Sequence, residues 1–158
     1  MPKSGLRWLW VTIIVVILDR LTKSLAQKYL IAYTALPVWS FFNLTLVYNK
    51  GAAFSFLSSA SGWQAWLFGG IAIAVTVFIL QWLYRLSYQE RWVSIALTCI
   101  AGGALGNLSD RILYGHVIDF IQLHVGELYW PAFNLADSAI CLGVVMLGVR
   151  MVKKEGFK

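Results

Sequence analysis

Charged residues are scarce in this chain of 158 residues, at 13% of the total against about 25% in an ordinary soluble domain. Only seven residues are acidic, whereas 59% are hydrophobic, and the mean hydropathy is +0.71. This composition excludes a soluble globular domain. It predicts an all-α integral membrane protein, which we expect to form a single domain over residues 1–158.

Cysteine and histidine are also scarce, with two residues of each type. Cys99 and Cys141 both lie in apolar segments, where we expect buried free thiols and no disulfide bridge. The spacing of His116, Asp119 and His124 matches no common metal site. We therefore expect neither a metal nor a cofactor.

The chain has a net charge of +6 but no basic stripe interleaved with stacking aromatics, so we expect no nucleic-acid partner. The glycine-rich stretch 102–106 follows no strand, which argues against a phosphate-binding loop and favours close helix packing. Basic residues gather at both ends of the chain and in one short central connection. This pattern indicates membrane topology and contact with anionic lipid.

Four apolar segments are long enough to cross a bilayer, at about residues 8–30, 66–84, 92–113 and 132–151. The first begins like a secretory signal, but no small-residue cleavage site follows it. We therefore expect an uncleaved first span whose second half is polar. Four spans and the distribution of Lys and Arg together predict that both termini are cytoplasmic.

The outer connection between the first two spans, residues 31–64, is too long for a bare loop. Large apolar side chains recur at every second position from Phe42 to Tyr48, which indicates a strand. Turn residues follow at 49–51, and residues 53–56 resume an extended pattern. We predict a small extracytoplasmic β-sheet region here, with an aromatic interfacial loop as the alternative.

All four aspartates, at positions 19, 110, 119 and 137, lie in or beside the apolar segments. A charge near the bilayer centre costs roughly 3 kcal/mol, so an acid in this setting is a candidate functional group. Three spans also carry polar residues on one face at their outer ends. These residues are Asp19 and Lys23 in the first span, Asn107, Asp110 and Arg111 in the third, and Asn134, Asp137, Ser138 and Cys141 in the fourth. Because isolated polar groups in lipid would stay unsatisfied, we predict one buried polar site near the outer leaflet.

Two of the aspartates have a basic neighbour in the sequence. Asp19 with Lys23, and Asp110 with Arg111, can form ion pairs that only lock the helices together. For Asp110 and Arg111 a functional role remains equally open.

Asp119 and Asp137 have no basic partner at helical spacing. Two carboxyl groups that share one proton can act together, one as a base toward water and one as an acid toward a carbonyl or leaving group. The helix N-terminus near Asp137 favours its ionised form, so we expect Asp119 to carry the proton.

Other functional classes are less well supported by the sequence. Intramembrane acids also occur in proton-coupled transporters and ion channels, but the chain has no inverted repeat and no charged residue in the cytoplasmic half of a span. A structural membrane subunit would explain the ion pairs but not two unpaired acids at one depth. Ser55, Ser109 and Ser138 have no convincing histidine partner for nucleophilic catalysis.

Five segments resemble, in order, the signature motifs of bacterial lipoprotein signal peptidases, the signal peptidase II family. They read DRLTK at 19–23, YNKGAAFS at 48–55, GGALGNLSDR at 102–111, GHVIDF at 115–120 and PAFNLADS at 131–138. The resemblance implies a metal-independent aspartic endopeptidase of the bacterial inner membrane. Such an enzyme removes the signal peptide from prolipoproteins just before a diacylglyceryl-modified cysteine, and the cyclic peptide globomycin inhibits it.

The resemblance also implies roles for single residues. Asp119 and Asp137 match the catalytic dyad of the family. Asn49, Asn107, Arg111 and Asn134 match polar residues that line its site, while Asp19 and Lys23 match a supporting motif, and Asp110 accompanies Arg111. We expect a monomer in contact with membrane lipid, and we expect the outer region around Phe54 to cover the substrate groove.

Overall fold

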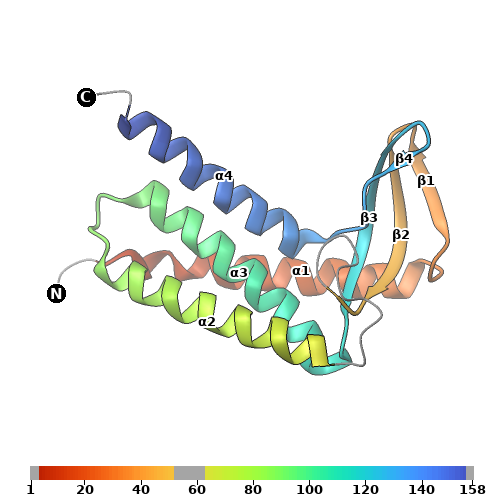
Figure 1. Ribbon diagram of the computed structural model, residues 1–158, viewed down its shortest axis with the longest axis horizontal. Helices are drawn as coiled ribbons and strands as arrows, with labels where there is room; N and C mark the ends of the chain where they lie inside the picture. Colours follow the sequence, from red (N-terminus) through yellow and green to blue (C-terminus); the bar gives the residue numbers. More distant parts are fainter. Residues whose placement is uncertain (1–3, 52–62, 156–158) are drawn as a thin grey trace.

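The computed structural model describes residues 4–51 and 63–155, which fold into a helical bundle with a small antiparallel sheet at one end (Figure 1). The helices are the 3-10 helix η1 (Gly5–Trp8) and the α-helices α1 (Leu9–Tyr29), α2 (Trp63–Arg85), α3 (Arg91–Tyr114) and α4 (Leu135–Glu155). The strands are β1 (Ala35–Trp39), β2 (Phe42–Asn49), β3 (Val117–Val125) and β4 (Leu128–Tyr129). Helix α1 begins and α4 ends at the end of the bundle opposite the sheet (Figure 1).

Helix α3 lies at the centre of the bundle and packs against α1, α2 and α4. Its small residues make this possible. A Cβ atom added at Gly106 would lie 2.6 Å from Asp19 Oδ2, and one at Gly103 would collide with the Ala136 carbonyl oxygen. The prediction that the glycine-rich stretch allows close packing is therefore confirmed.

Three helices are long and apolar enough to cross a membrane among the described residues, namely Trp63–Arg85, Arg91–Tyr114 and Leu135–Lys153. The molecule is thus a mostly helical membrane protein. Helix α1 is long enough but is not apolar enough to be counted with them, because Asp19, Arg20 and Lys23 lie in its second half. Helix α4 begins three residues later than predicted, since Phe133 still pairs with Ile121 of the sheet.

The sheet has the order β1-β2-β3-β4, with every pair antiparallel. The prediction placed it between the first two helices, and β1 and β2 do lie there. Strands β3 and β4 come instead from the connection between α3 and α4. The start of β3 is buried on both faces, so it lacks the alternating pattern that reveals a half-exposed strand. The extended pattern predicted for residues 53–56 lies outside the described residues.

A left-handed turn at Gly115, with φ of 73°, ends α3 and sends the chain into β3. Strand β3 then crosses the end of the bundle, where Ile118 and Phe120 pack with Ala26 of α1 and Leu46 of β2. This crossing brings residue 119 over the last turn of α3 and the first turn of α4 (Figure 1).

Candidate active site

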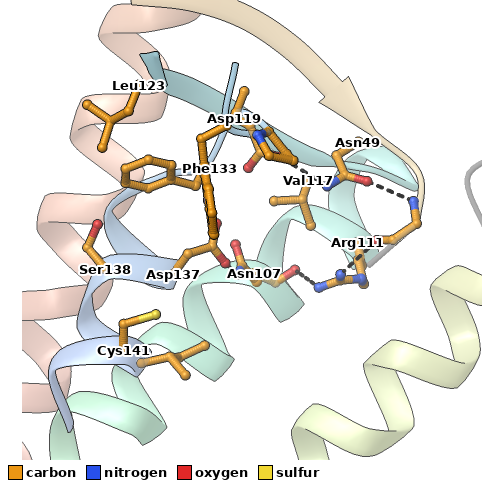
Figure 2. Close-up of a pocket in the computed structure, with 15 residues that line it drawn as sticks. Asn49, Asn107, Arg111, Val117, Asp119, Leu123, Phe133, Asp137, Ser138 and Cys141 are labelled. Carbon is orange, nitrogen blue, oxygen red and sulfur yellow. Dashed lines mark hydrogen bonds between the residues drawn. The ribbon is translucent and has the colours of Figure 1, made fainter. Parts of the chain in front are cut away.

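A cavity of about 560 Å³ lies where β3 crosses the end of the bundle (Figure 2). Its polar lining includes five of the residues singled out from the sequence, and its walls are otherwise mainly apolar. These five are Asn49, Asn107, Arg111, Asp119 and Asp137; Ser138 and Cys141 of the predicted polar stripe also line the cavity, and the apolar residues include Val117, Leu123, Trp130, Phe133 and Ile140. The cavity therefore combines two carboxyl groups with an apolar wall.

Asp137 lies in the first turn of α4, where it forms a reciprocal capping box with Asn134. The Asp137 backbone N–H donates to Asn134 Oδ1 at 2.9 Å, and the Asn134 N–H donates to Asp137 Oδ2 at 3.1 Å. Asn107 Nδ2 donates to the other carboxylate oxygen, Oδ1, at 2.8 Å. Both oxygens of Asp137 thus accept hydrogen bonds, which stabilise its negative charge. The three-residue spacing of Asn134 and Asp137 is a capping signal that the sequence already contained.

Asp119 lies on β3 and is 2% exposed. Asn134 Nδ2 donates to its Oδ1 at 2.7 Å and Asn49 Nδ2 donates to its Oδ2 at 3.0 Å. The pKa of Asp119 is raised to about 7, first by burial and second by the charge of Asp137, against the lowering effect of the two amides and of Lys23. The neutral acid form of Asp119 is therefore favoured far more than in a free aspartate side chain.

Arg111 reaches the cavity from α3. Its guanidinium donates to the carbonyl oxygens of Asn107 at 3.2 Å and Gly51 at 3.3 Å, and it lies 5.4 Å from the centre of the Phe68 ring. Among the described residues it makes no ion pair within 4 Å, so of the two readings left open for Asp110 and Arg111 the ion pair does not form. Neighbouring residues on a helix point about 100° apart and cannot face each other.

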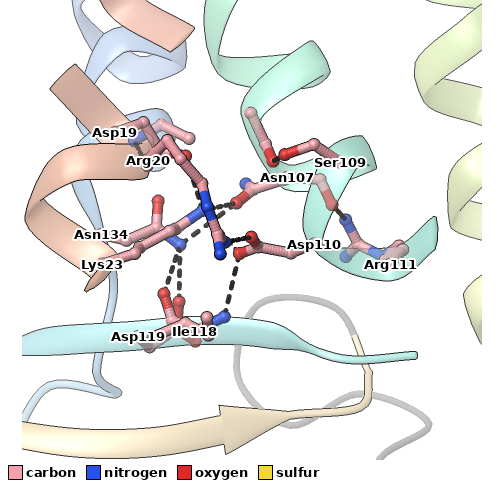
Figure 3. Close-up of polar contacts among 12 residues, drawn as sticks. Asp19, Arg20, Lys23, Asn107, Ser109, Asp110, Arg111, Ile118, Asp119 and Asn134 are labelled. Carbon is pink, nitrogen blue, oxygen red and sulfur yellow. Dashed lines mark hydrogen bonds and ion pairs between the residues drawn. The ribbon is translucent and has the colours of Figure 1, made fainter. Parts of the chain in front are cut away.

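Asp110 pairs instead with two basic residues of α1. Its Oδ2 lies 2.8 Å from Lys23 Nζ and also accepts the Ile118 N–H at 3.2 Å, while its Oδ1 lies 3.3 Å from the Arg20 guanidinium (Figure 3). Arg20 also donates to the Tyr114 hydroxyl. Sequence reasoning missed Arg20 as a partner of Asp110, because only the packing of α1 on α3 brings the two together.

Lys23 is buried at the centre of this group and pairs with Asp19 at 2.7 Å. The ion pair predicted from their spacing is confirmed. Asn134 is also fully buried, and with Asp19, Lys23 and Asp110 it stands behind the cavity lining. The predicted polar residues therefore divide into a group facing the cavity and a group sealed beneath it.

Histidine and cysteine could have formed a metal site, but the described residues contain no such site. Within residues 4–51 and 63–155, no group of three or more His, Cys, Asp or Glu side chains is placed to hold a metal ion. The His116 ring packs against Tyr48 and the His124 ring against Tyr129. Cys99 is buried, but Cys141 is exposed and lines the cavity, so its predicted burial is wrong.

Sequence and structure comparisons agree with one another. The chain is 52% identical over 153 residues to the lipoprotein signal peptidase of Pseudoalteromonas atlantica, which covers 97% of this chain and 93% of that protein. It is 51% identical over 152 residues to the lipoprotein signal peptidase of Pseudomonas aeruginosa, with 95% and 90% covered. A solved structure of a bacterial membrane enzyme superposes with a TM-score of 0.86 at 28% identity, covering 100% of this chain and 96% of the other.

The family model for signal peptidase II matches residues 11–153, which include both cavity carboxyl groups and the buried cluster beneath them. The family model matches most of the chain, and the two relatives are about half identical to it over at least 90% of their own length. The chain belongs to the signal peptidase II family.

Proposed function

We propose that this protein is a membrane aspartic endopeptidase that removes the signal peptide from prolipoproteins, cutting just before the diacylglyceryl-modified cysteine. Family membership and the relatives named lipoprotein signal peptidase support the reaction and the substrate class. The observation that carries the mechanism is that Asp119 and Asp137 line one cavity, held by amide donors. Within the described parts of the chain, neither carboxyl group has an ion-pairing cation within 4 Å. The alternative of a small transporter has no comparable support.

The two carboxyl groups divide acid and base work according to their surroundings. Asp137 accepts N–H donors on both oxygens at a helix N-terminus and serves as the carboxylate. Asp119, whose pKa burial raises to about 7, serves as the carboxylic acid. This is the same division of roles that the sequence predicted, with a base and an acid in the lining of one cavity.

In the first step, Asp137 takes a proton from water while the water oxygen attacks the peptide carbonyl carbon. Asp119 gives its proton to the carbonyl oxygen, so the tetrahedral intermediate forms without an uncompensated charge. In the second step the carbon–nitrogen bond breaks, Asp137 passes its proton to the departing amine, and Asp119 recovers a proton from the intermediate's hydroxyl. Both carboxyl groups return to their starting states.

The remaining cavity residues bind and orient the substrate. Arg111 donates to two backbone carbonyl oxygens, and the remaining N–H groups of its guanidinium can hold a carbonyl of the substrate. Asn49 donates from Nδ2 to Asp119 Oδ2 at 3.0 Å, and its Oδ1 accepts the Gly51 N–H at 2.9 Å. These two hydrogen bonds fix the edge of the cavity next to β2. The apolar wall suits the signal helix and acyl chains. The expected cover around Phe54 lies outside the described residues.

The placement in the membrane extends to α1, which we propose as a fourth span. Its charged residues Asp19 and Lys23 point inward and are at most 1% exposed, whereas Ile17, Leu21 and Leu25 are about half exposed on its outer face. Helices normally bury their polar groups in a bundle and present apolar ones to lipid. Charge inside and hydrocarbon outside is therefore the pattern of a membrane-spanning helix.

The orientation follows from the two ends of the bundle. Basic residues lie near the helix ends that are remote from the sheet, namely Arg7, Arg85, Arg91, Arg150 and Lys153. The positive-inside rule places this end in the cytoplasm of a bacterial cell, with both termini, and places the sheet and cavity at the outer leaflet of the inner membrane. A lipid-modified cysteine at that interface can enter the cavity sideways. We propose a monomer that forms one domain, works without metal, and is inhibited by globomycin.

The decisive experiment incubates purified protein in detergent with a diacylglyceryl-modified prolipoprotein and follows the mass of the product. We expect cleavage before the modified cysteine, unaffected by a metal chelator, and no cleavage by Asp119→Asn or Asp137→Asn. Thermal unfolding of each variant in the same detergent serves as the folding control. Sensitivity to the chelator, or full activity in either folded variant, would contradict the assigned mechanism.

A further inference from the structure

The ammonium group of Lys23 is the centre of the buried cluster in Figure 3. It lies 2.7 Å from Asp19 Oδ2, 2.8 Å from Asp110 Oδ2 and 3.0 Å from Asn107 Oδ1. A lysine ammonium has three N–H donors and no acceptor, so each of these oxygens faces a group that can only donate. Two partners are charges that balance it, but the third is the neutral amide of a cavity residue.

The contact with Lys23 settles which way the Asn107 amide points. A group that can only donate must face the amide oxygen, which leaves the Asn107 NH₂ group on the opposite edge. That edge lies against the cavity, where Asn107 Nδ2 donates to Asp137 Oδ1 at 2.8 Å. A rotated amide would instead place its oxygen against the Asp137 carboxylate and its NH₂ group against the ammonium. Both contacts would then be repulsive.

Asn134 reinforces the same orientation from α4. Its Nδ2 donates to Asn107 Oδ1 at 3.1 Å and to Asp119 Oδ1 at 2.7 Å. The oxygen of Asn107 thus accepts from two donors, while its NH₂ group serves Asp137. A continuous path of hydrogen bonds leads from Lys23 through two asparagines to both carboxyl groups of the cavity.

A second contact of the cluster reaches the first turn of α4. Asp19 Oδ1 accepts the backbone N–H of Ala136 at 2.9 Å, one residue before Asp137. This N–H belongs to the first turn of the helix and has no partner within it. The pair of Lys23 and Asp19 therefore holds Asp137 from two sides, through its hydrogen-bond donor and through its backbone.

We propose that Lys23 is a positioning residue for the carboxyl pair, because it fixes the orientation of the Asn107 amide that donates to Asp137. The proposal rests on the proposed function of that pair. Lys23 itself does not line the cavity, so it acts through Asn107 and does not contact the substrate.

Arg20 offers a matched control on the same helix. Like Lys23 it is a cation of α1 that pairs with Asp110, at 3.3 Å, but no contact joins it to Asn107. A purely stabilising role predicts similar consequences for the loss of either cation once the folded fraction is taken into account. A positioning role predicts that only Lys23 affects the chemical step.

The test compares Lys23→Met with Arg20→Met, using the purified chain and a diacylglyceryl-modified prolipoprotein. We expect kcat per folded molecule to fall about 100-fold in Lys23→Met, with KM little changed, as for a misplaced catalytic group. We expect Arg20→Met to retain its kcat. Equal losses of kcat per folded molecule in the two variants would overturn the proposal.

The pH profile of kcat gives a second measure that lost stability alone does not move. The charged groups around the carboxyl pair of Asp119 and Asp137 are Lys23, Asp19 and Arg20 of α1 and Asp110 and Arg111 of α3. The Lys23 charge lowers the pKa of Asp119, so its removal should move the limb of the profile that Asp119 controls to higher pH. An unmoved profile in Lys23→Met would also contradict the proposal.

Two further experiments apply if Lys23→Met does not fold. The double variant Asp19→Asn with Lys23→Met removes one charge of each sign, and it should show the same loss of kcat per folded molecule. In the unsubstituted chain, the side-chain NH₂ of Asn107 should exchange slowly with solvent, and fast exchange would overturn the proposal. Cleavage by the wild type and its loss in Asp119→Asn test the proposed function separately. If the wild type cleaves the substrate and Asp119→Asn does not, the proposed function stands. Equal behaviour of Lys23→Met and Arg20→Met would then refute only the positioning role of Lys23.

Discussion

Two neighbouring groups of acidic residues at the same end of the bundle differ in what surrounds them. Asp19 and Asp110 are at most 1% exposed, and each carboxylate lies within 3 Å of the Lys23 ammonium. Asp119 and Asp137 face a cavity, and their hydrogen-bond donors are amides. A buried acid whose charge is balanced serves to hold helices together, whereas an acid held by neutral donors at an open cavity keeps its proton chemistry available.

The largest expected effect is on cleavage at the cavity. Asp137→Asn should lower kcat by about 1,000-fold or more, because the variant has no base to activate water. Asp110→Asn should lose less than about tenfold per folded molecule, since it leaves both cavity carboxyl groups in place. Rates measured on lipidated prolipoprotein at equal folded protein concentration test this contrast. Comparable losses in the two variants would erase the distinction between the groups.

The same two variants should rank in the reverse order for stability, with Asp110→Asn losing more than Asp137→Asn. Removal of the Asp110 charge leaves Lys23 and Arg20 short of a partner, and breaking a buried ion pair costs about 3–5 kcal/mol. The free energy of unfolding of Asp137→Asn should change by less than about 1 kcal/mol, because an amide oxygen can still accept an N–H at the capping box. Thermal unfolding in one detergent measures both variants. A larger loss of stability in Asp137→Asn than in Asp110→Asn would contradict the distinction between a stabilising buried group and a cavity group.

The pH dependence of stability tests the surroundings of Asp119, one member of the cavity group. The pKa of Asp119 is about 7 in the folded protein against 3.8 for the free side chain, so the folded state binds the proton more tightly. Stability from this group is fully present below about pH 4 and falls on the order of a few kcal/mol as the pH rises to about 7. Asp119→Asn should flatten this slope and unfold at a higher temperature than the wild type at pH 8. An unchanged slope would mean that Asp119 ionises as easily when folded as when unfolded.

The smallest effect concerns the packing beneath both groups. Gly106→Ala would place a Cβ atom 2.6 Å from Asp19 Oδ2, and such overpacking costs about 1–3 kcal/mol. Gly70→Ala, with no atom within 4 Å of its added Cβ, should instead gain up to about 1 kcal/mol from helix propensity. Unfolding temperatures of the two variants in detergent give the comparison. A stabilised Gly106→Ala would show that α1 and α3 can separate without cost.

Several features of the site were predictable because they depend on local spacing. The i and i+4 positions of Asp19 and Lys23 place them on one helix face, and the ion pair forms as expected. The helix containing Asn107 and Arg111, and the helix beginning beside Asp137, could be located from their apolar composition alone. The absence of a basic neighbour at helical spacing also singled out Asp119 and Asp137 before their positions were known.

Other features could not be predicted because they depend on contacts between distant segments. Strand β3 was hidden in the sequence, since residues buried on both faces show no alternation. Arg20 stands next to Asp19 in the chain, yet it pairs with Asp110 across the bundle. Cys141 lies in an apolar segment of the sequence, where a buried thiol is expected. In the fold, its position on α4 faces the cavity, and its side chain is exposed.

The sequence by itself determined the class of molecule, the positions of its helices and the set of polar residues that lipid could not leave unsatisfied. These properties follow from hydropathy and helical periodicity, which act over a few turns of chain. Only the tertiary structure decided which acids are neutralised and which remain available for chemistry. The reason is that an acid's role depends on the charges and donors within about 4 Å, and most of those come from other helices or strands.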